Sequence, residues 1–160
     1  GACTLTPGLP IAQEEGHGSL MQIVRLSSEN AALLSNLAAG VFDEPVQQRF
    51  LDAFLNDARH VMFVAVESDQ VVGMGSAVEY FHPDKPPQLW INEVGVSPAF
   101  QRRGIGRAIV DALVREAKAR GCVFAWLGTA HDNVSGQACF ASVNDVSAPQ
   151  PFLLYEWELE

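Results

Sequence analysis

The segment with the clearest chemical potential runs from Gln101 to Arg107 and reads Gln-Arg-Arg-Gly-Ile-Gly-Arg. An apolar run that ends at Val96 precedes it, and a helical pattern of apolar residues follows it. Backbone N–H groups at the start of a helix have no helical partners, and the helix dipole adds to their attraction for an anion. Gly104 and Gly106 would let a pyrophosphate approach where a Cβ would intrude. The segment therefore predicts a phosphate-binding turn, with glycines that serve only tight packing as the alternative.

The charge of this segment is opposite to that of the whole chain. The 160 residues include 19 acidic and 10 basic side chains, for a net charge of −9. Three of the ten basic residues nevertheless fall within six positions, as Arg102, Arg103 and Arg107. An acidic chain lacks the basic face that nucleic-acid binding needs, and no apolar run reaches the roughly 18 residues of a membrane span. We therefore predict no nucleic-acid partner, no membrane insertion, and either a solvated acidic surface or a cationic partner.

Glu93 is the best candidate for a general base. It lies within the apolar run Trp90–Val96, directly before the basic turn. A carboxylate can take the proton that an ammonium group must lose before its nitrogen attacks a carbonyl carbon. Partial burial in this run would make the carboxylate a stronger base. The alternatives are that Glu93 only pairs with a neighbouring arginine, or holds a substrate without moving protons.

Other chemistries find little support. The three cysteines, Cys3, Cys122 and Cys139, form no CxxC pair, and the four histidines match no zinc spacing. Motifs of serine hydrolases, zinc proteases and P-loop proteins are absent. We therefore expect no bound metal, no disulfide framework and a cytoplasmic location.

The elements that would position these residues follow from periodicity and turn signals. A proline-rich loop over 82–87 should interrupt the sheet, and the wholly apolar run 122–127 should be a central strand. Residues 1–19 read as a disordered or expression-derived leader, and 20–160 as one α+β domain. The predicted strands span 20–26, 60–67, 71–80, 88–96, 122–127 and 152–159, and the predicted helices span 29–39, 46–57, 104–120 and 134–142.

The run Gln101–Gly106 matches in full the signature [Q/R]-x-x-G-x-[G/A], and it follows a predicted strand and precedes a predicted helix. With this context the chain resembles the GNAT superfamily of acetyl-CoA-dependent N-acetyltransferases from about Leu20 to Leu159. The resemblance implies a GNAT-like α+β fold, with a central mixed, mostly antiparallel sheet of six to seven strands flanked by about four helices. It also implies acetyl-CoA as cosubstrate without a metal, and, by analogy, a possible homodimer.

The resemblance also assigns roles to residues. Glu93 would be the general base, the strand before the motif would hydrogen-bond the pantetheine arm, and the turn would hold the pyrophosphate. Asn133 matches an asparagine that contacts the cofactor in the family, although a helix cap explains it equally well. The cofactor-binding residues implied in this way are Val94, Val96, Gln101, Arg102, Arg103, Gly104, Ile105, Gly106, Arg107 and Asn133.

One position departs from the family pattern. Many members carry a tyrosine in the helix after the fifth strand as proton donor to the CoA thiolate, and here Phe140 takes its place. The proton would then come from water, from another group such as Tyr80, or from nothing. A non-catalytic CoA-binding domain is therefore one alternative function.

The acceptor amine is suggested by a weaker resemblance and by charge. The segments Val41–Pro45, Tyr80–Pro87 and Trp90–Val96 resemble type I aminoglycoside 3-N-acetyltransferases. An acidic cleft would also concentrate a polycation such as an aminoglycoside antibiotic. Polyamines, amino acids and peptide amines remain alternative acceptors. The expected acceptor-binding residues are Asp43, Glu44, Glu79, Tyr80 and Asp132.

Overall fold

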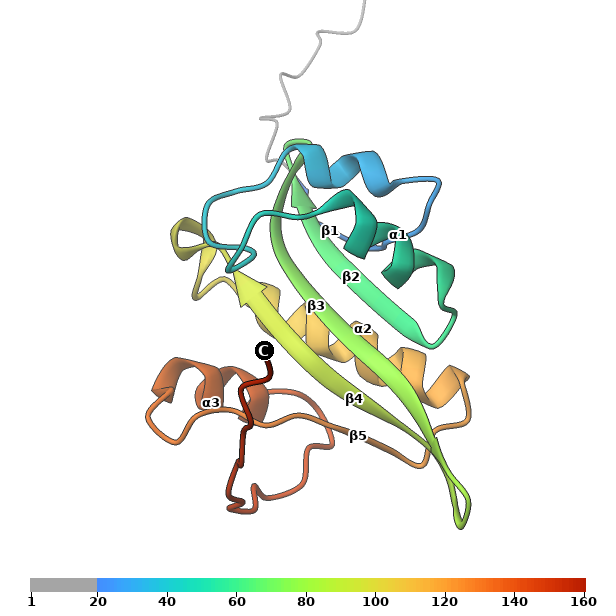
Figure 1. The fold of residues 1–160 in the computed structure, drawn as a ribbon. Helices are drawn as coiled ribbons and strands as arrows, with labels where there is room; N and C mark the ends of the chain where they lie inside the picture. Colours follow the sequence, from blue (N-terminus) through green and yellow to red (C-terminus); the bar gives the residue numbers. More distant parts are fainter. Residues whose placement is uncertain (1–19) are drawn as a thin grey trace, which may run out of the picture.

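The computed structural model describes residues 20–160, and the predicted leader lies outside them (Figure 1). Its sheet has the spatial order β1-β2-β3-β4-β5. All neighbouring strands are antiparallel except β4 and β5, which are parallel because α2 connects them on one face of the sheet. The strands are β1 (Gln22–Arg25), β2 (His60–Glu67), β3 (Gln70–His82), β4 (Lys85–Val96) and β5 (Phe124–Trp126).

Helices cover both faces of this sheet. Helix α2 lies on one face, whereas α1 and the short η1 lie on the other, over β1 to β3 (Figure 1). The mixed α/β architecture confirms the predicted fold class, with five strands and three α-helices among residues 20–160 where six to seven strands and about four helices were expected. The helices are the α-helices α1 (Gln48–Asn56), α2 (Ile105–Ala119) and α3 (Val134–Ala141) and the 3₁₀ helices η1 (Ala31–Ser35) and η2 (Pro98–Phe100).

Helix α2 packs unusually close to β3, and this contact forms the centre of the core. Ile109 and Leu113 of α2 are fully buried. A Cβ added at Gly75 of β3 would lie 2.4 Å from Cγ2 of Ile109 and 3.0 Å from Cδ1 of Leu113. Glycine at this position therefore sets the distance between helix and sheet, and with it the position of the α2 N-terminus.

The helix predicted over 29–39 is wrong, because only Ala31–Ser35 forms a 3₁₀ turn. The residues after it hydrogen-bond to the start of β3 instead of continuing a helix. The amide of Ala38 donates to the carbonyl of Val71, and the amide of Val71 donates to the carbonyl of Asn36.

The interruption predicted over 82–87 is also wrong. Strands β3 and β4 form one long hairpin, in which His82 pairs with Lys85. Pro83 lies in the turn between the two strands, and Pro86 and Pro87 lie opposite the register shift between Tyr80 and His82, a place that tolerates residues without an N–H group.

Two predictions about the last third of the chain fail. Strand β5 is a three-residue strand at the edge of the sheet, where Phe124 is 65% exposed and Trp126 is 44% exposed, so it is not central. Residues 152–159 form neither helix nor strand, and their large apolar side chains are exposed. No helix in residues 20–160 has the length and apolar content needed to cross a bilayer.

Candidate active site

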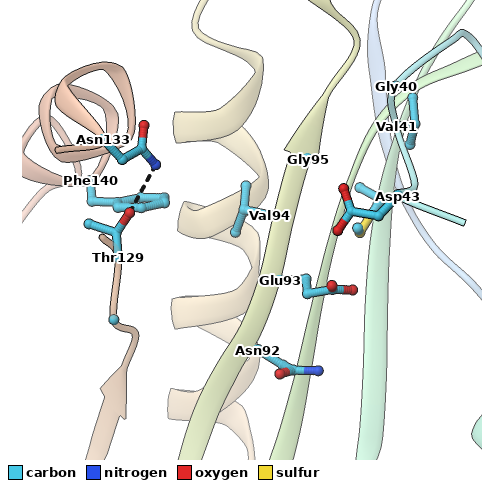
Figure 2. Close-up of a pocket in the computed structure, with 12 residues that line it drawn as sticks. Gly40, Val41, Asp43, Asn92, Glu93, Val94, Gly95, Thr129, Asn133 and Phe140 are labelled. Atoms are coloured by element: carbon cyan, nitrogen blue, oxygen red, sulfur yellow. Dashed lines mark hydrogen bonds between the residues drawn. The ribbon is translucent and has the colours of Figure 1, made fainter. Parts of the chain in front are cut away.

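A cleft opens where β4 loses its neighbour. Strand β5 pairs with β4 only over three positions, the last of which joins Trp90 to Trp126. Strand β4 continues to Val96, while the chain after β5 diverges toward α3, and a cavity of about 250 Å³ lies along this part of β4 (Figure 2). Its lining residues are Gly40, Val41, Asp43, Met74, Asn92, Glu93, Val94, Gly95, Gly128, Thr129, Asn133 and Phe140.

A β-bulge in β4 shapes one side of the cleft. Ser76 pairs with Glu93 and the next residue, Ala77, pairs with Ile91, so Asn92 is an extra residue without a partner on β3. A bulge bends its strand and breaks the strict alternation of side chains. Asn92 and Glu93 consequently point to the same side, whereas Val94 points toward the α3 side (Figure 2).

A second carboxylate reaches the cleft from the loop after η1. Gly95 permits this approach, because a Cβ there would lie 2.5 Å from the carbonyl oxygen of Val41. The loop thereby brings Asp43 to the side of β4 on which Glu93 lies (Figure 2). Both carboxylates are exposed, so the partial burial expected for Glu93 is wrong.

The opposite wall of the cleft comes from the chain around the start of α3. Asn133 caps α3, since its Oδ1 accepts a hydrogen bond from the amide of Gly136 at 3.1 Å. Its Nδ2 donates to Oγ1 of Thr129 at 2.9 Å, so the capping interpretation holds and one side chain joins two parts of this wall. Phe140 lines the cleft beside them, and its ring carries no proton that could be transferred.

The glycine-bearing turn opens α2, as predicted. Gly104 is the N-cap residue with φ +79°, and no side chain caps the helix, so the amides of its first turn remain available to an anion. A Cβ at Gly104 would contact nothing, so its left-handed backbone explains the glycine there. At Gly106 a Cβ would lie 2.9 Å from Sγ of Cys139 on α3, so tight packing explains that glycine.

Several polar side chains of the turn already have protein partners. Gln101 donates to the carbonyl of Val96 at 3.0 Å. Nη2 of Arg103 bonds both carboxylate oxygens of Glu67 at 2.9 and 3.1 Å, and Arg107 donates to Asn144 at 3.2 Å. Of the predicted cofactor residues, only Val94 and Asn133 line the cleft, and the turn from Gln101 to Arg107 lies outside its lining.

Of the five predicted acceptor residues, only Asp43 lines the cleft. Glu79 points to the α2 face of the sheet, where Nη1 of Arg120 donates to its Oε2 at 2.9 Å. This placement does not fit the acceptor contact predicted for Glu79. Glu44 and Asp132 are exposed beside the cleft residues Asp43 and Asn133 without lining the cavity.

Tyr80 lies on β3 opposite Gln88, and its hydroxyl donates to Oε1 of Gln88 at 2.6 Å. Gln88 pairs with Tyr80 and Glu93 pairs with Ser76, four positions apart on β3 or about 13 Å of strand, so this geometry does not support Tyr80 as proton donor in the cleft. The sequence reasoning missed Asn92 and Thr129, because a single asparagine or threonine carries no motif.

Neither described cysteine has the properties of a nucleophile. Burial raises the pKa of the Cys139 thiol, which packs against Gly106. Burial and, to a smaller extent, the charge of Glu79 raise the pKa of the Cys122 thiol. Within residues 20–160, no three histidine, cysteine, aspartate or glutamate side chains gather in a way that could hold a metal ion.

Comparisons with known proteins agree with this geometry. The sequence profile described as the Acetyltransferase (GNAT) family matches residues 30–144. Over 50 residues, the chain is 38% identical to the ribosomal protein bS18-alanine N-acetyltransferase of Salmonella typhimurium. This match covers 31% of the chain and spans 34% of that relative, so the two share only about a third of the relative's length.

Solved structures with a similar fold include aminoglycoside acetyltransferases. The enzyme meta-AAC0020 from an uncultured soil metagenomic sample gives a TM-score of 0.75 at 17% identity, covering 88% of this chain and 97% of the other. AAC(6')-Iy, bound to a CoA-containing bisubstrate analogue, gives a TM-score of 0.71 at 17% identity, covering 88% and 100%. Identities this low show the fold alone. The presence of a 6'-type enzyme among these structures means that the likeness is not specific to the 3-N type.

Proposed function

The chain belongs to the GNAT family of acetyltransferases, and we propose from this premise that it transfers the acetyl group of acetyl-CoA to a primary amine of a polycationic small molecule. An aminoglycoside is the best candidate for this acceptor. The observation that carries the proposal is the pair of carboxylates, Asp43 and Glu93, which reach one cleft from different elements. Two negative charges on one wall favour a cationic substrate over a neutral or anionic one.

The two sides of β4 suit the two substrates. After Trp90, the edge of β4 has no paired strand among residues 20–160, so its backbone N–H and C=O groups can bond an extended ligand such as the pantetheine arm. The uncapped N-terminus of α2 lies beyond the end of this edge and suits a pyrophosphate. Arg102, whose guanidinium has no hydrogen bond or ion pair within residues 20–160, could add a positive charge there. Bound acetyl-CoA would supply the activated acetyl group.

In this proposal Glu93 removes the proton from the acceptor ammonium, directly or through a water molecule. The free nitrogen then forms the new N–C bond, and the thioester C–S bond breaks. The proton taken up by Glu93 passes to solvent, because the carboxylate is exposed. No covalent enzyme intermediate is needed, and the raised pKa of Cys139 keeps the only thiol of α3 protonated and weakly nucleophilic.

The leaving thiolate needs a proton that Phe140 cannot supply. Thr129 lies on the same wall, and Asn133 donates to its Oγ1 at 2.9 Å. This bond uses an acceptor site of the hydroxyl and leaves the hydroxyl proton for another partner. The nitrogen loses its second proton as the N–C bond forms, and we assign to Thr129 the relay of that proton: its hydroxyl passes a proton to the sulfur and takes up the one from the nitrogen, directly or through a water molecule, so that thiol and threonine both end protonated.

A peptide N-terminus is the second candidate acceptor, since the 50 residues shared with the ribosomal protein alanine N-acetyltransferase are 38% identical. A thiol-release assay separates the candidates, with acetyl-CoA offered alongside aminoglycosides, polyamines and alanine-terminated peptides. We expect turnover with the aminoglycosides. Turnover confined to peptides would replace this acceptor assignment, and acetyl-CoA binding without turnover on any amine would favour a non-catalytic domain.

The role of Glu93 is tested with Glu93→Gln and a matched control, Glu44→Gln, which changes an exposed carboxylate outside the cleft lining. Loss of a general base lowers kcat/KM by about 100-fold or more. We expect that loss for Glu93→Gln at neutral pH, with acetyl-CoA affinity nearly unchanged, and wild-type rates for Glu44→Gln. An unchanged rate for Glu93→Gln contradicts the base assignment.

A further inference from the structure

A cluster of aromatic side chains lies on the exposed face of the sheet, beyond the cleft. Trp90 of β4 pairs directly with Trp126 of β5, and their rings stack with centroids 5.9 Å apart and planes inclined by 24°. Trp90 is 38% exposed and Trp126 is 44% exposed. Large aromatic side chains are normally buried, so two stacked indoles with exposed faces mark a candidate binding surface.

The pair is held in a fixed orientation before any ligand binds. Nε1 of Trp126 donates to the hydroxyl of Tyr80 at 3.0 Å, and that hydroxyl donates to Gln88 at 2.6 Å. The polar edge of Trp126 is therefore satisfied inside the protein, and what the surface offers is the faces of the rings. Such faces attract ammonium groups and the C–H bonds of saturated rings.

The indoles lie on the same face of the sheet as the catalytic carboxylate. Leu89 and Ile91 are buried against the α2 side, so Trp90 between them points to the opposite side. The bulge at Asn92 turns Glu93 to that same side. Trp90 pairs with Val78 and Glu93 pairs with Ser76, which are two positions apart on β3, so Trp90 and Glu93 are about 7 Å apart along the strand.

We propose that Trp90 and Trp126 form a second acceptor subsite, which binds a cationic sugar ring of an amino-sugar acceptor while another ring presents its amine to Glu93. This inference rests on the proposed function and specifies its substrate further. Across a separation of about 7 Å, a molecule with two or more rings can place one ring at the indoles while another presents its amine to Glu93, whereas a single ring at Glu93 covers less of the indole surface. The two positions are then linked within one ligand, which raises affinity without new contacts at the reacting amine.

Both indoles remain partly exposed with the whole described chain in place, so a small molecule can reach them. The net charge of −9 and the carboxylates of Asp43 and Glu93 favour a cationic occupant over an apolar peptide. A second copy of the chain is the other occupant to test.

The test compares wild type with Trp126→Leu, which removes the ring face but keeps an apolar side chain. The probes are neamine, with two rings, and 2-deoxystreptamine, with one. We expect Trp126→Leu to raise KM for neamine about tenfold, or about 1.4 kcal/mol, with little change in kcat. The KM values for 2-deoxystreptamine and acetyl-CoA should stay within about twofold.

Two further variants serve as controls for this experiment. Phe81→Leu changes another aromatic side chain, which is 64% exposed and follows Tyr80 on β3, so that it lies on the opposite face of the strand. It should leave kcat and all KM values unchanged. Trp126→Phe keeps a ring face and should give an intermediate KM for neamine. If the two Trp126 variants unfold, Trp90→Leu serves in their place.

Binding is also measured without turnover. In a Trp157→Phe background, Trp90 and Trp126 are the remaining tryptophans, and saturable quenching of their fluorescence by neamine is expected.

If wild type acetylates neamine but Trp126→Leu does so with an unchanged KM and no quenching occurs, the subsite is overturned and the proposed function stands. If wild type acetylates no amine yet neamine quenches the indoles, the proposed function fails and the subsite stands. A Trp126→Leu variant that changes only the oligomeric state, measured by analytical ultracentrifugation, assigns the surface to a second copy and overturns the inference.

Discussion

The chemistry of the cleft depends on a few side chains that have no structural substitute. Glu93 and Asp43 supply its negative charge, and Thr129 and Asn133 supply its hydrogen-bond donors. Phe140 occupies the position where many family members have a tyrosine, so the hydroxyl nearest in role is that of Thr129. The side chains that hold the loops, such as Gln101 on the carbonyl of Val96, act through the backbone.

At this scale we predict that Thr129→Val lowers kcat about tenfold, because the departing thiolate loses a protonated hydroxyl on its wall of the cleft. The KM values for acetyl-CoA and amine should change little, since valine keeps the shape of the side chain. Thr129→Ser restores a hydroxyl and is the matched control. Steady-state kinetics in the thiol-release assay measure both variants, and equal kcat values for valine and serine would remove Thr129 from the mechanism.

At the scale of elements, an ion cluster fixes the C-terminal end of α2 to the sheet. Arg120 donates to Glu79 of β3, to Glu116 of α2 and to the carbonyl of Ala58, each at 2.9 Å. Burial opposes its charge, but the hydrogen bonds to Glu116 and Glu79 raise the pKa of Arg120 above its ordinary value. The cluster thus holds the helix whose other end carries the glycine-bearing turn from Gln101 to Arg107.

We predict that Arg120→Met lowers the free energy of unfolding by about 2 to 3 kcal/mol, because Glu79 is left partly buried without its cation and Glu116 keeps only its ion pair with Arg25. Arg115→Met is the control, since it removes only an exposed pair with Asp111 four residues earlier and should cost less than about 0.5 kcal/mol. Urea denaturation followed by circular dichroism measures both. Equal losses in the two variants would show that the cluster contributes no more than a surface pair.

The elements also show which features the sequence can and cannot reveal. Helix α2 was predicted to within one residue at each end, because its apolar residues repeat at three and four positions and glycines bound it. Strand β5 was predicted to be central but lies at the edge of the sheet. An apolar run has the same sequence pattern whether the strand has neighbours on both sides or on one. The pair Glu79–Arg120 joins residues 41 positions apart, and no local pattern contains such a contact.

The candidate site also contains residues that the sequence reveals and residues that it does not. The turn before α2 and Glu93 have motif neighbours that reveal them, whereas Asn92 matters only because β3 and β4 pair with a shifted register. Register depends on which strands meet, and this is decided by packing over the whole sheet. The alternation of residues 152–159 predicted a strand, but alternation alone does not provide a neighbouring strand with which to pair.

At the scale of the whole molecule, charge is separated by function. The chain has a net charge of −9, two of its carboxylates line the cleft, and the uncapped N-terminus of α2 with Arg102 lies apart from the cleft lining. Such a distribution attracts a cation to one side of β4 and phosphates to the far end of the strand. Under the proposed function, the two substrates would thus be attracted to different places before any specific contact forms.

This separation predicts a salt dependence that differs between acceptors. Screening lengths fall from about 30 Å at 0.01 M salt to about 10 Å at 0.1 M. Between these concentrations, kcat/KM for neamine should fall by about threefold to tenfold, whereas a singly charged amine should lose less than about twofold. Assays across a sodium chloride series at saturating acetyl-CoA measure this, and parallel slopes for the two amines would mean that the acidic surface plays no part in recruitment.

The bulge at Asn92 changes the phase of β4 in mid-strand. Before it, even-numbered side chains of β4 face away from α2, and after it odd-numbered ones do. Removing Asn92 would therefore leave its neighbours on their present faces and restore an unbroken hydrogen-bond ladder with β3. A single deletion could therefore remove the irregular pairing beside the cleft without turning any neighbouring side chain to the other face of the sheet.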